Sequence, residues 1–172
     1  MMKINIAQLK KEIGSTQTFS FQIPVAELGL EKQEEIWTGD VSAEGFVKNK
    51  GTIYEVAGTI KATMNDLCSR CLEPVVIVLN IPFCEEYREV DFKELSEVSE
   101  SEVTYFDGDD IEITDLVREN ILLAKPLKPV CGEECRGLCP ECGANMNIST
   151  CNCNLLKTDP RLAVLQKLLP KD

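Results

Sequence analysis

Histidine is absent from the 172 residues of this chain, and aromatic residues make up only 6% of them. Without histidine the chain has no Ser–His or Cys–His catalytic pair and no catalytic zinc ion held by imidazole. No glycine-rich phosphate loop follows a strand, and no activated nucleophile or general base stands out. We therefore expect a protein that is not an enzyme and has no small-molecule substrate.

Long apolar runs are missing as well. No segment reaches the length of a membrane span, and the first residues, MMKINIAQLKKEIG, lack the apolar run of a signal peptide. Cysteines without a signal peptide indicate a reducing compartment. We expect a cytoplasmic protein with no membrane partner.

Cations are scarce in the middle of the chain. The net charge is -11, and the acidic excess lies almost entirely in residues 85–120, whereas the flanking segments are nearly neutral. General binding to nucleic acid needs clustered lysine and arginine, so the overall charge disfavours it. The acidic segment instead suits a basic protein partner.

Cysteine, by contrast, is abundant. Eight of the nine cysteines form four close pairs, which are Cys68/Cys71, Cys131/Cys135, Cys139/Cys142 and Cys151/Cys153. Two pairs of thiolates on tight turns make one tetrahedral zinc site, so we expect two zinc ions per chain. Proximity along the chain assigns Cys139, Cys142, Cys151 and Cys153 to a self-contained zinc ribbon. Cys68 and Cys71 then join Cys131 and Cys135 in a second site, which clips the early chain to the late chain.

Other interpretations of the cysteines remain open. Four thiolates also suit an iron–sulfur cluster, and a disulfide framework or a redox dithiol at Cys68/Cys71 are further alternatives. Ligand spacing does not exclude an exchange of partners among the three late pairs. The ninth cysteine, Cys84, lies in an apolar stretch and is expected to be a small buried hydrophobic residue.

The apolar pattern predicts an α+β fold: an antiparallel curled sheet with one or two helices and a C-terminal four-cysteine zinc ribbon. Two domains are expected, an antiparallel β-sheet domain with an acidic loop and a helix over residues 1–130, and a cysteine-rich zinc-binding module with a terminal helix over residues 131–172. Alternating apolar residues predict the strands, over 3–7, 18–23, 36–47, 52–64, 74–83 and 103–106. The fifth of these is the most apolar, which predicts a central position, and Asn49-Lys50-Gly51 predicts a hairpin turn.

Two helices and two loops complete the prediction. Thr114 is expected to cap a helix over residues 115–124, and Asp159 with Pro160 opens a final helix that ends at Leu169. Residues 89–102 are acidic and contain serine, which predicts a mobile loop. Residues 107–110 predict a solvated turn, since the spacing of a calcium loop is missing.

The cysteine-rich end is mildly basic, which makes it the candidate surface for RNA phosphate. The candidate nucleic-acid contacts are Arg70, Lys128, Arg136, Lys157 and Arg161. Scattered cations are also what any solvated surface carries.

Four motifs stand out together: Cys68-Ser69-Arg70-Cys71-Leu72, Leu123-Ala124-Lys125-Pro126-Leu127, Gly137-Leu138-Cys139-Pro140-Glu141-Cys142-Gly143 and Asp159-Pro160-Arg161. In combination they resemble the YceD family of large ribosomal RNA subunit accumulation proteins. The resemblance implies a role in the accumulation or processing of large-subunit (23S) ribosomal RNA, and hence in ribosome assembly. It also implies that Cys68, Cys71, Cys131 and Cys135 form the site shared in the family, with the later ribbon as an addition.

We therefore expect a non-catalytic assembly factor built around structural zinc sites. Its expected partner is large-subunit ribosomal RNA or a pre-ribosomal particle, with a basic ribosomal protein as one route of contact. The alternatives are a zinc-dependent nucleic-acid or transcription adaptor and a redox or metal-handling protein.

Overall fold

The structure is a computed structural model that describes residues 1–30, 37–90 and 104–153. The chain folds as two compact units. The first, which we call the sheet unit, consists of Met1–Asp66 and Val75–Leu127. The second, which we call the cysteine unit, consists of Leu67–Pro74 and Lys128–Asp172, so it draws on two distant parts of the chain.

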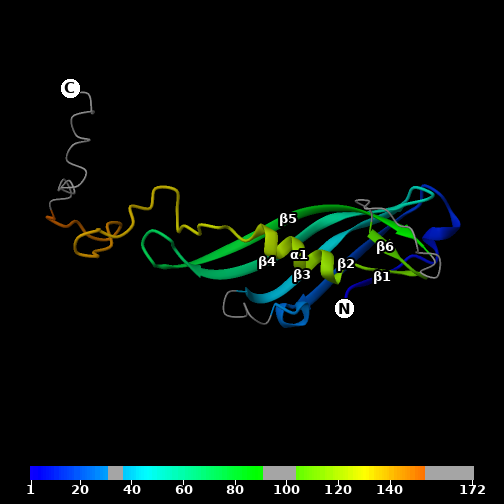
Figure 1. Cartoon of the computed structure of the whole chain (residues 1–172), viewed down its shortest axis with the longest axis horizontal. Helices are drawn as coiled ribbons and strands as arrows, with labels where there is room; N and C mark the ends of the chain where they lie inside the picture. The colour runs from blue at the N-terminus through cyan, green and yellow to red at the C-terminus, as the bar shows by residue number, and fades with distance from the viewer. Residues whose placement is uncertain (31–36, 91–103, 154–172) are drawn as a thin grey trace, which may run out of the picture. The chain divides into compact units, whose positions relative to one another are not determined.

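One five-stranded sheet forms the scaffold of the sheet unit (Figure 1). Its strands, in spatial order, are β2 (Thr16–Pro24), β3 (Trp37–Asn49), β4 (Tyr54–Leu67), β5 (Pro74–Glu89) and β6 (Thr104–Phe106). The expected turn at Asn49 joins β3 to β4. The Asn49 side chain accepts a hydrogen bond from the Gly51 backbone at 2.7 Å and donates one to the Leu9 carbonyl at 2.8 Å.

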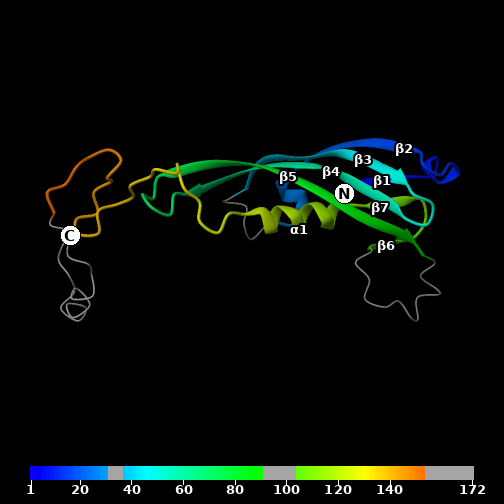
Figure 2. The ribbon, with the colours of Figure 1, turned by 90° about the horizontal axis from the view of Figure 1, so that it is seen from above.

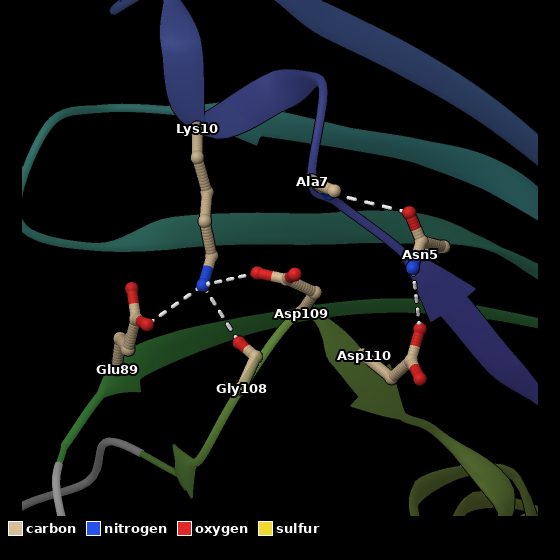
Figure 3. Close-up of polar contacts among 7 residues, drawn as sticks. All are labelled: Asn5, Ala7, Lys10, Glu89, Gly108, Asp109 and Asp110. Atoms are coloured by element: carbon tan, nitrogen blue, oxygen red, sulfur yellow. Dashed lines mark hydrogen bonds and ion pairs between the residues drawn. The ribbon is translucent and has the colours of Figure 1, made fainter.

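A second, two-stranded sheet pairs the start of the chain with its middle. Strand β1 (Lys3–Asn5) runs antiparallel to β7 (Asp110–Glu112). Beside it, the Lys10 ammonium group contacts the Glu89 carboxylate at 2.6 Å, the Gly108 carbonyl at 2.7 Å and the Asp109 carboxylate at 2.9 Å (Figure 3). The acidic turn at residues 107–110 is therefore tied to the rest of the unit by Lys10.

Helix α1 (Thr114–Ala124) buries Val117 and Ile121 in the core and runs alongside the sheet (Figure 2). Two short 3-10 helices, η1 (Leu9–Lys11) and η2 (Val25–Leu28), contribute Leu9, Val25 and Leu28 to the same core. The core is thus assembled by one face of the sheet and the elements that cover it.

The strand order corrects two predictions. The sheet is not antiparallel throughout, because β6 pairs with β5 in parallel, Tyr87 opposite Thr104. The long connection from Glu89 to Thr104 permits a parallel pairing that a tight hairpin would not. Nor is β5 the central strand. That position belongs to β4, and on β5 the side chains of Val76 and Val78 are 67% and 63% exposed.

Two single residues also differ from expectation. Ile113, not Thr114, occupies the N-cap position of α1, and the Thr114 hydroxyl instead accepts a hydrogen bond from the Met2 backbone at 2.8 Å. Cys84 is exposed rather than buried, because it lies on the outward face of β5. The expected helix at residues 159–169 lies outside the described residues, as does nearly all of the acidic loop at 89–102.

Candidate metal centres

The first cysteine pair lies on a turn between β4 and β5. The Cys68 carbonyl accepts a hydrogen bond from the Leu72 backbone at 2.8 Å, and the Cys68 N–H donates to the Glu73 carbonyl at 2.8 Å. Leu72 adopts a left-handed conformation with φ 60°, which closes the turn. Both cysteines are buried, so the turn holds two thiols on its inner side.

The pair Cys139/Cys142 lies on a turn of the same kind. The Cys139 carbonyl accepts from the Gly143 backbone at 2.9 Å, and the Cys139 N–H donates to the Ala144 carbonyl at 2.8 Å. Gly143 has φ 73°. A single bridge between Leu138 and Asn145 flanks the turn, which gives this segment the form of a small ribbon.

Cys68, Cys71, Cys131 and Cys135 come together as the sequence predicted, with all four sulfur atoms within 4.8 Å of one another. The Cys68 and Cys135 sulfurs are 3.8 Å apart, and those of Cys71 and Cys131 are 3.6 Å apart. Four sulfurs bound tetrahedrally at about 2.3 Å lie about 3.8 Å from each other, whereas a disulfide brings two sulfurs to about 2.05 Å. The spacing fits a metal centre, and all nine cysteines are free.

Polar contacts hold the two halves of this first centre together. The Arg70 guanidinium donates to the carbonyls of Glu133 at 2.9 Å and Cys135 at 3.0 Å, and the Ser69 N–H donates to the Pro129 carbonyl at 2.8 Å. The Asn147 amide donates to the Cys135 sulfur at 3.3 Å. Sequence reasoning missed Asn147, because no ligand-spacing rule identifies a donor that lies beyond the cysteines themselves.

Cys139, Cys142, Cys151 and Cys153 form the second centre, again with all four sulfurs within 4.8 Å of one another. The segment that leads into it touches the first centre, since the Leu138 N–H donates to the Arg70 carbonyl at 3.0 Å. The two centres are therefore neighbours within the cysteine unit. The structure groups the cysteines as proximity along the chain suggested, without an exchange among the late pairs.

Backbone N–H groups favour the thiolate form at both turns. Burial alone would raise the pKa of Cys68, but N–H groups of Cys71, Arg70 and Cys131 outweigh it and lower that pKa to about 6. The backbone of Cys142 and Glu141 lowers the pKa of Cys139 to about 7. These donors are suited to stabilising sulfur that carries negative charge.

One thiol in each centre has a strongly raised pKa. Hydrogen bonds with neighbouring thiols, that of Cys135 foremost, raise the pKa of Cys131 to about 12. Contact with the Cys142 thiol has the same effect on Cys153, whose pKa rises to about 12. Four thiolates repel each other at this spacing, so a fully deprotonated set needs a cation at its centre.

The candidate nucleic-acid residues are placed unevenly. The Arg70 guanidinium donates hydrogen bonds to backbone carbonyls at the first centre, whereas Lys128 and Arg136 are exposed in the cysteine unit. Lys157 and Arg161 lie outside the described residues. Among the described residues no helix is long and apolar enough to cross a membrane.

Fold and site define the class: a mostly-sheet α+β protein with two four-cysteine groups that could each hold a metal ion. The chain belongs to the YceD family, whose family model, described as Large ribosomal RNA subunit accumulation protein YceD, matches residues 56–169.

Individual relatives agree with this assignment. The uncharacterized protein YlbN of Bacillus subtilis is 30% identical over 133 residues, 77% of this chain and 74% of its own length. An uncharacterized protein of Mycobacterium tuberculosis is 31% identical over 114 residues, 66% of this chain. The match spans 55% of that relative, about half its length. No solved structure matches the chain.

Proposed function

We propose that this protein is a non-catalytic factor that supports the accumulation or processing of 23S ribosomal RNA and the assembly of the large ribosomal subunit. The family description supplies the process. The observation that carries the proposal is the pair of complete four-cysteine groups in the cysteine unit. Such groups are common in small modules that present a recognition surface, not a reaction centre.

Each group is proposed to hold one structural zinc ion, bound by Cys68, Cys71, Cys131 and Cys135 or by Cys139, Cys142, Cys151 and Cys153. Sulfur-only donor sets of this size suit zinc, and an all-cysteine tetrahedral site is closed, so no position is left for a reactive water. Binding of the metal would contribute directly to the folding energy of a unit whose described part contains only one isolated β-bridge.

Precursor particles of the large subunit are the proposed partner, and the cysteine-rich module at residues 131–172 is the proposed contact with RNA. Arg136 is exposed within this module and Lys128 is exposed just before it, and Lys157 and Arg161 belong to the same basic stretch of sequence. Arg70 is the weakest of the candidate contacts, because the first centre already uses its guanidinium. The sheet domain at residues 1–130 is proposed to contact a basic ribosomal protein through its acidic segment.

Complementation in cells that lack the protein tests this function. We expect such cells to accumulate less mature 23S ribosomal RNA and more of its precursors, relative to 16S, and the wild-type chain to restore the ratio. A chain with Cys139→Ser and Cys142→Ser should not restore it, whereas Cys84→Ser, outside both centres, should. An unchanged ratio in the cells without the protein contradicts the proposal.

A further inference from the structure

Two adjoining hollows surround Tyr87 in the sheet unit. One, of about 450 Å³, is lined by β6, the 107–110 turn, Lys3 and Glu112. The other, of about 380 Å³, lies between β5, β6 and the first half of α1, and is lined by Glu85, Asp115 and Glu119 among others. Tyr87, Thr104 and Glu112 line both, so the hollows meet around the end of β5.

The lining of these hollows is acidic. Asp109 is neutralised by Lys10 and Asp115 by Arg118, but the carboxylates of Glu85, Glu112 and Glu119 make no ion pair among the described residues. Lys3 is the only cation in the described lining of either hollow. An incoming positive charge would therefore meet a net negative wall.

Tyr87 adds an observation independent of charge. Tyr87 is only 3% exposed, and its hydroxyl has no hydrogen-bond partner in the described part of the chain. No side-chain oxygen or nitrogen of the described residues is both fully buried and unpartnered, so this hydroxyl opens into the hollows, where a ligand can hydrogen-bond to it. The neighbouring carboxylates of Glu85 and Glu119 make the hydroxyl a suitable companion for a bound cation.

No three of these carboxylates converge on one point as metal ligands would. Within the described residues the only groups of three or more potential metal ligands that converge are the two cysteine centres. Spread carboxylates and a hydroxyl instead match the several N–H donors of a guanidinium, or ammonium groups on neighbouring side chains.

Strand β5 next to the hollows has an edge that a peptide could join. It is sixteen residues long, yet β6 pairs with it only from Tyr87 to Glu89. On that side, no described strand pairs with β5 from Pro74 to Glu86. An open edge offers backbone N–H and C=O groups to an extended chain, which a free polyamine cannot use.

We propose that the acidic hollows around Tyr87 and the open edge of β5 together bind an extended segment of a partner protein that is rich in arginine or lysine. The backbone of the segment pairs with β5 before β6 begins, and a cationic side chain enters the hollow between Glu85, Glu119 and the Tyr87 hydroxyl. The inference relies on the proposed function only for the partner's identity, a basic protein of the large subunit.

Binding of a fluorescent peptide of alternating arginine and threonine to the full-length, zinc-loaded protein tests this by anisotropy. We expect saturable binding that weakens with added salt, about tenfold weaker binding in the double variant Glu112→Gln and Glu119→Gln, and no change in Glu44→Gln, an exposed glutamate on β3. Tyr87→Phe removes only a hydroxyl without a partner, so it should fold normally and bind several-fold more weakly.

Three results would overturn the proposal: no saturable binding, equal binding by the Glu112/Glu119 variant, or equal binding by a peptide whose backbone N–H groups are methylated. If spermidine displaced the peptide at an equal concentration, the hollows would bind small cations in general and not an extended peptide. This binding assay uses purified components, whereas the complementation test measures the ribosomal RNA ratio in cells. A negative result in one does not decide the other, so the peptide-binding proposal and the proposed function can fail independently.

Discussion

Leu72 and Gly143 occupy the same position of two equivalent turns. Each directly follows the second cysteine of a Cys-x2-Cys pair, each donates its N–H to the carbonyl of the first cysteine, and each has positive φ, 60° and 73°. Only glycine adopts this conformation without cost, so the first centre carries backbone strain that the second avoids.

Gly143→Ala should lower the free energy of unfolding of the zinc-loaded protein by about 1 kcal/mol, because the left-handed conformation is sterically unfavourable for alanine. Among the described residues, no atom beyond the two chain neighbours of Gly143 would lie within 4 Å of the added methyl group, so the cost comes from the backbone conformation. Chemical denaturation followed by circular dichroism measures it. Gly132→Ala is the matched control, since Gly132 also faces open space but lacks positive φ, and it should be neutral.

Leu72→Gly should act in the opposite direction and stabilise the protein by about 0.5 kcal/mol. Relief of the left-handed strain exceeds the entropy that glycine adds to the unfolded chain, and the Leu72 side chain is 59% exposed, so little burial is lost. The same denaturation experiment applies. A destabilised variant would mean that Leu72 packs in a way that its exposure does not indicate.

Cys68→Ser should reduce the bound zinc from two ions per chain to one and abolish the ordered structure of the first centre. Removing one thiolate leaves three, and the metal's contribution to folding is lost there. Elemental analysis of the purified protein gives the stoichiometry. Cys84→Ser, which changes the exposed cysteine of β5, should retain two ions; a wild-type value near one would remove one of the two sites.

Lys10→Met should destabilise the sheet unit by about 0.5–1 kcal/mol, a modest amount because Glu89 and Asp109 are half exposed and water screens them. Burial by itself lowers the pKa of Lys10, but its contacts with Glu89 and Asp109 prevail and raise the pKa above its usual 10.5. The contribution of Lys10 is thus complete below about pH 10 and is lost as the pH rises through the folded-state pKa.

Unfolding curves from pH 7 to 11 test this dependence. The gap in stability between the wild type and Lys10→Met should stay constant up to about pH 10 and then shrink. Lys11→Met is the control, because the Lys11 ammonium group contacts only the Gln8 amide oxygen in the described structure. A gap that widens with pH would contradict the assignment.

Local chemistry made much of this structure predictable. The Cys-x2-Cys turns, the Asn49 hairpin and the alternating strands each follow from residues adjacent in sequence, and proximity along the chain was enough to group the eight cysteines correctly. The helix expected over residues 115–124 is likewise present as α1, which buries Val117 and Ile121.

Relations between distant residues could not be predicted. The run from Pro74 to Phe83 is apolar on both faces, so its sequence does not reveal that β5 lies next to the edge and exposes Val76. Thr114 has the side chain of a helix cap, but its hydroxyl accepts a hydrogen bond from the Met2 N–H, more than a hundred residues away in the sequence. The isolated Tyr87 hydroxyl likewise depends on how β5, β6 and α1 meet.

Sedimentation of the tagged protein through a sucrose gradient, with each fraction probed for 23S ribosomal RNA and its precursors, tests the assembly role most directly. We predict co-migration with precursor particles of the large subunit, lost when Cys139 and Cys142 are both changed to serine and retained in Cys84→Ser. A wild-type protein found only at the top of the gradient would contradict the assembly role and favour a free partner or a redox function.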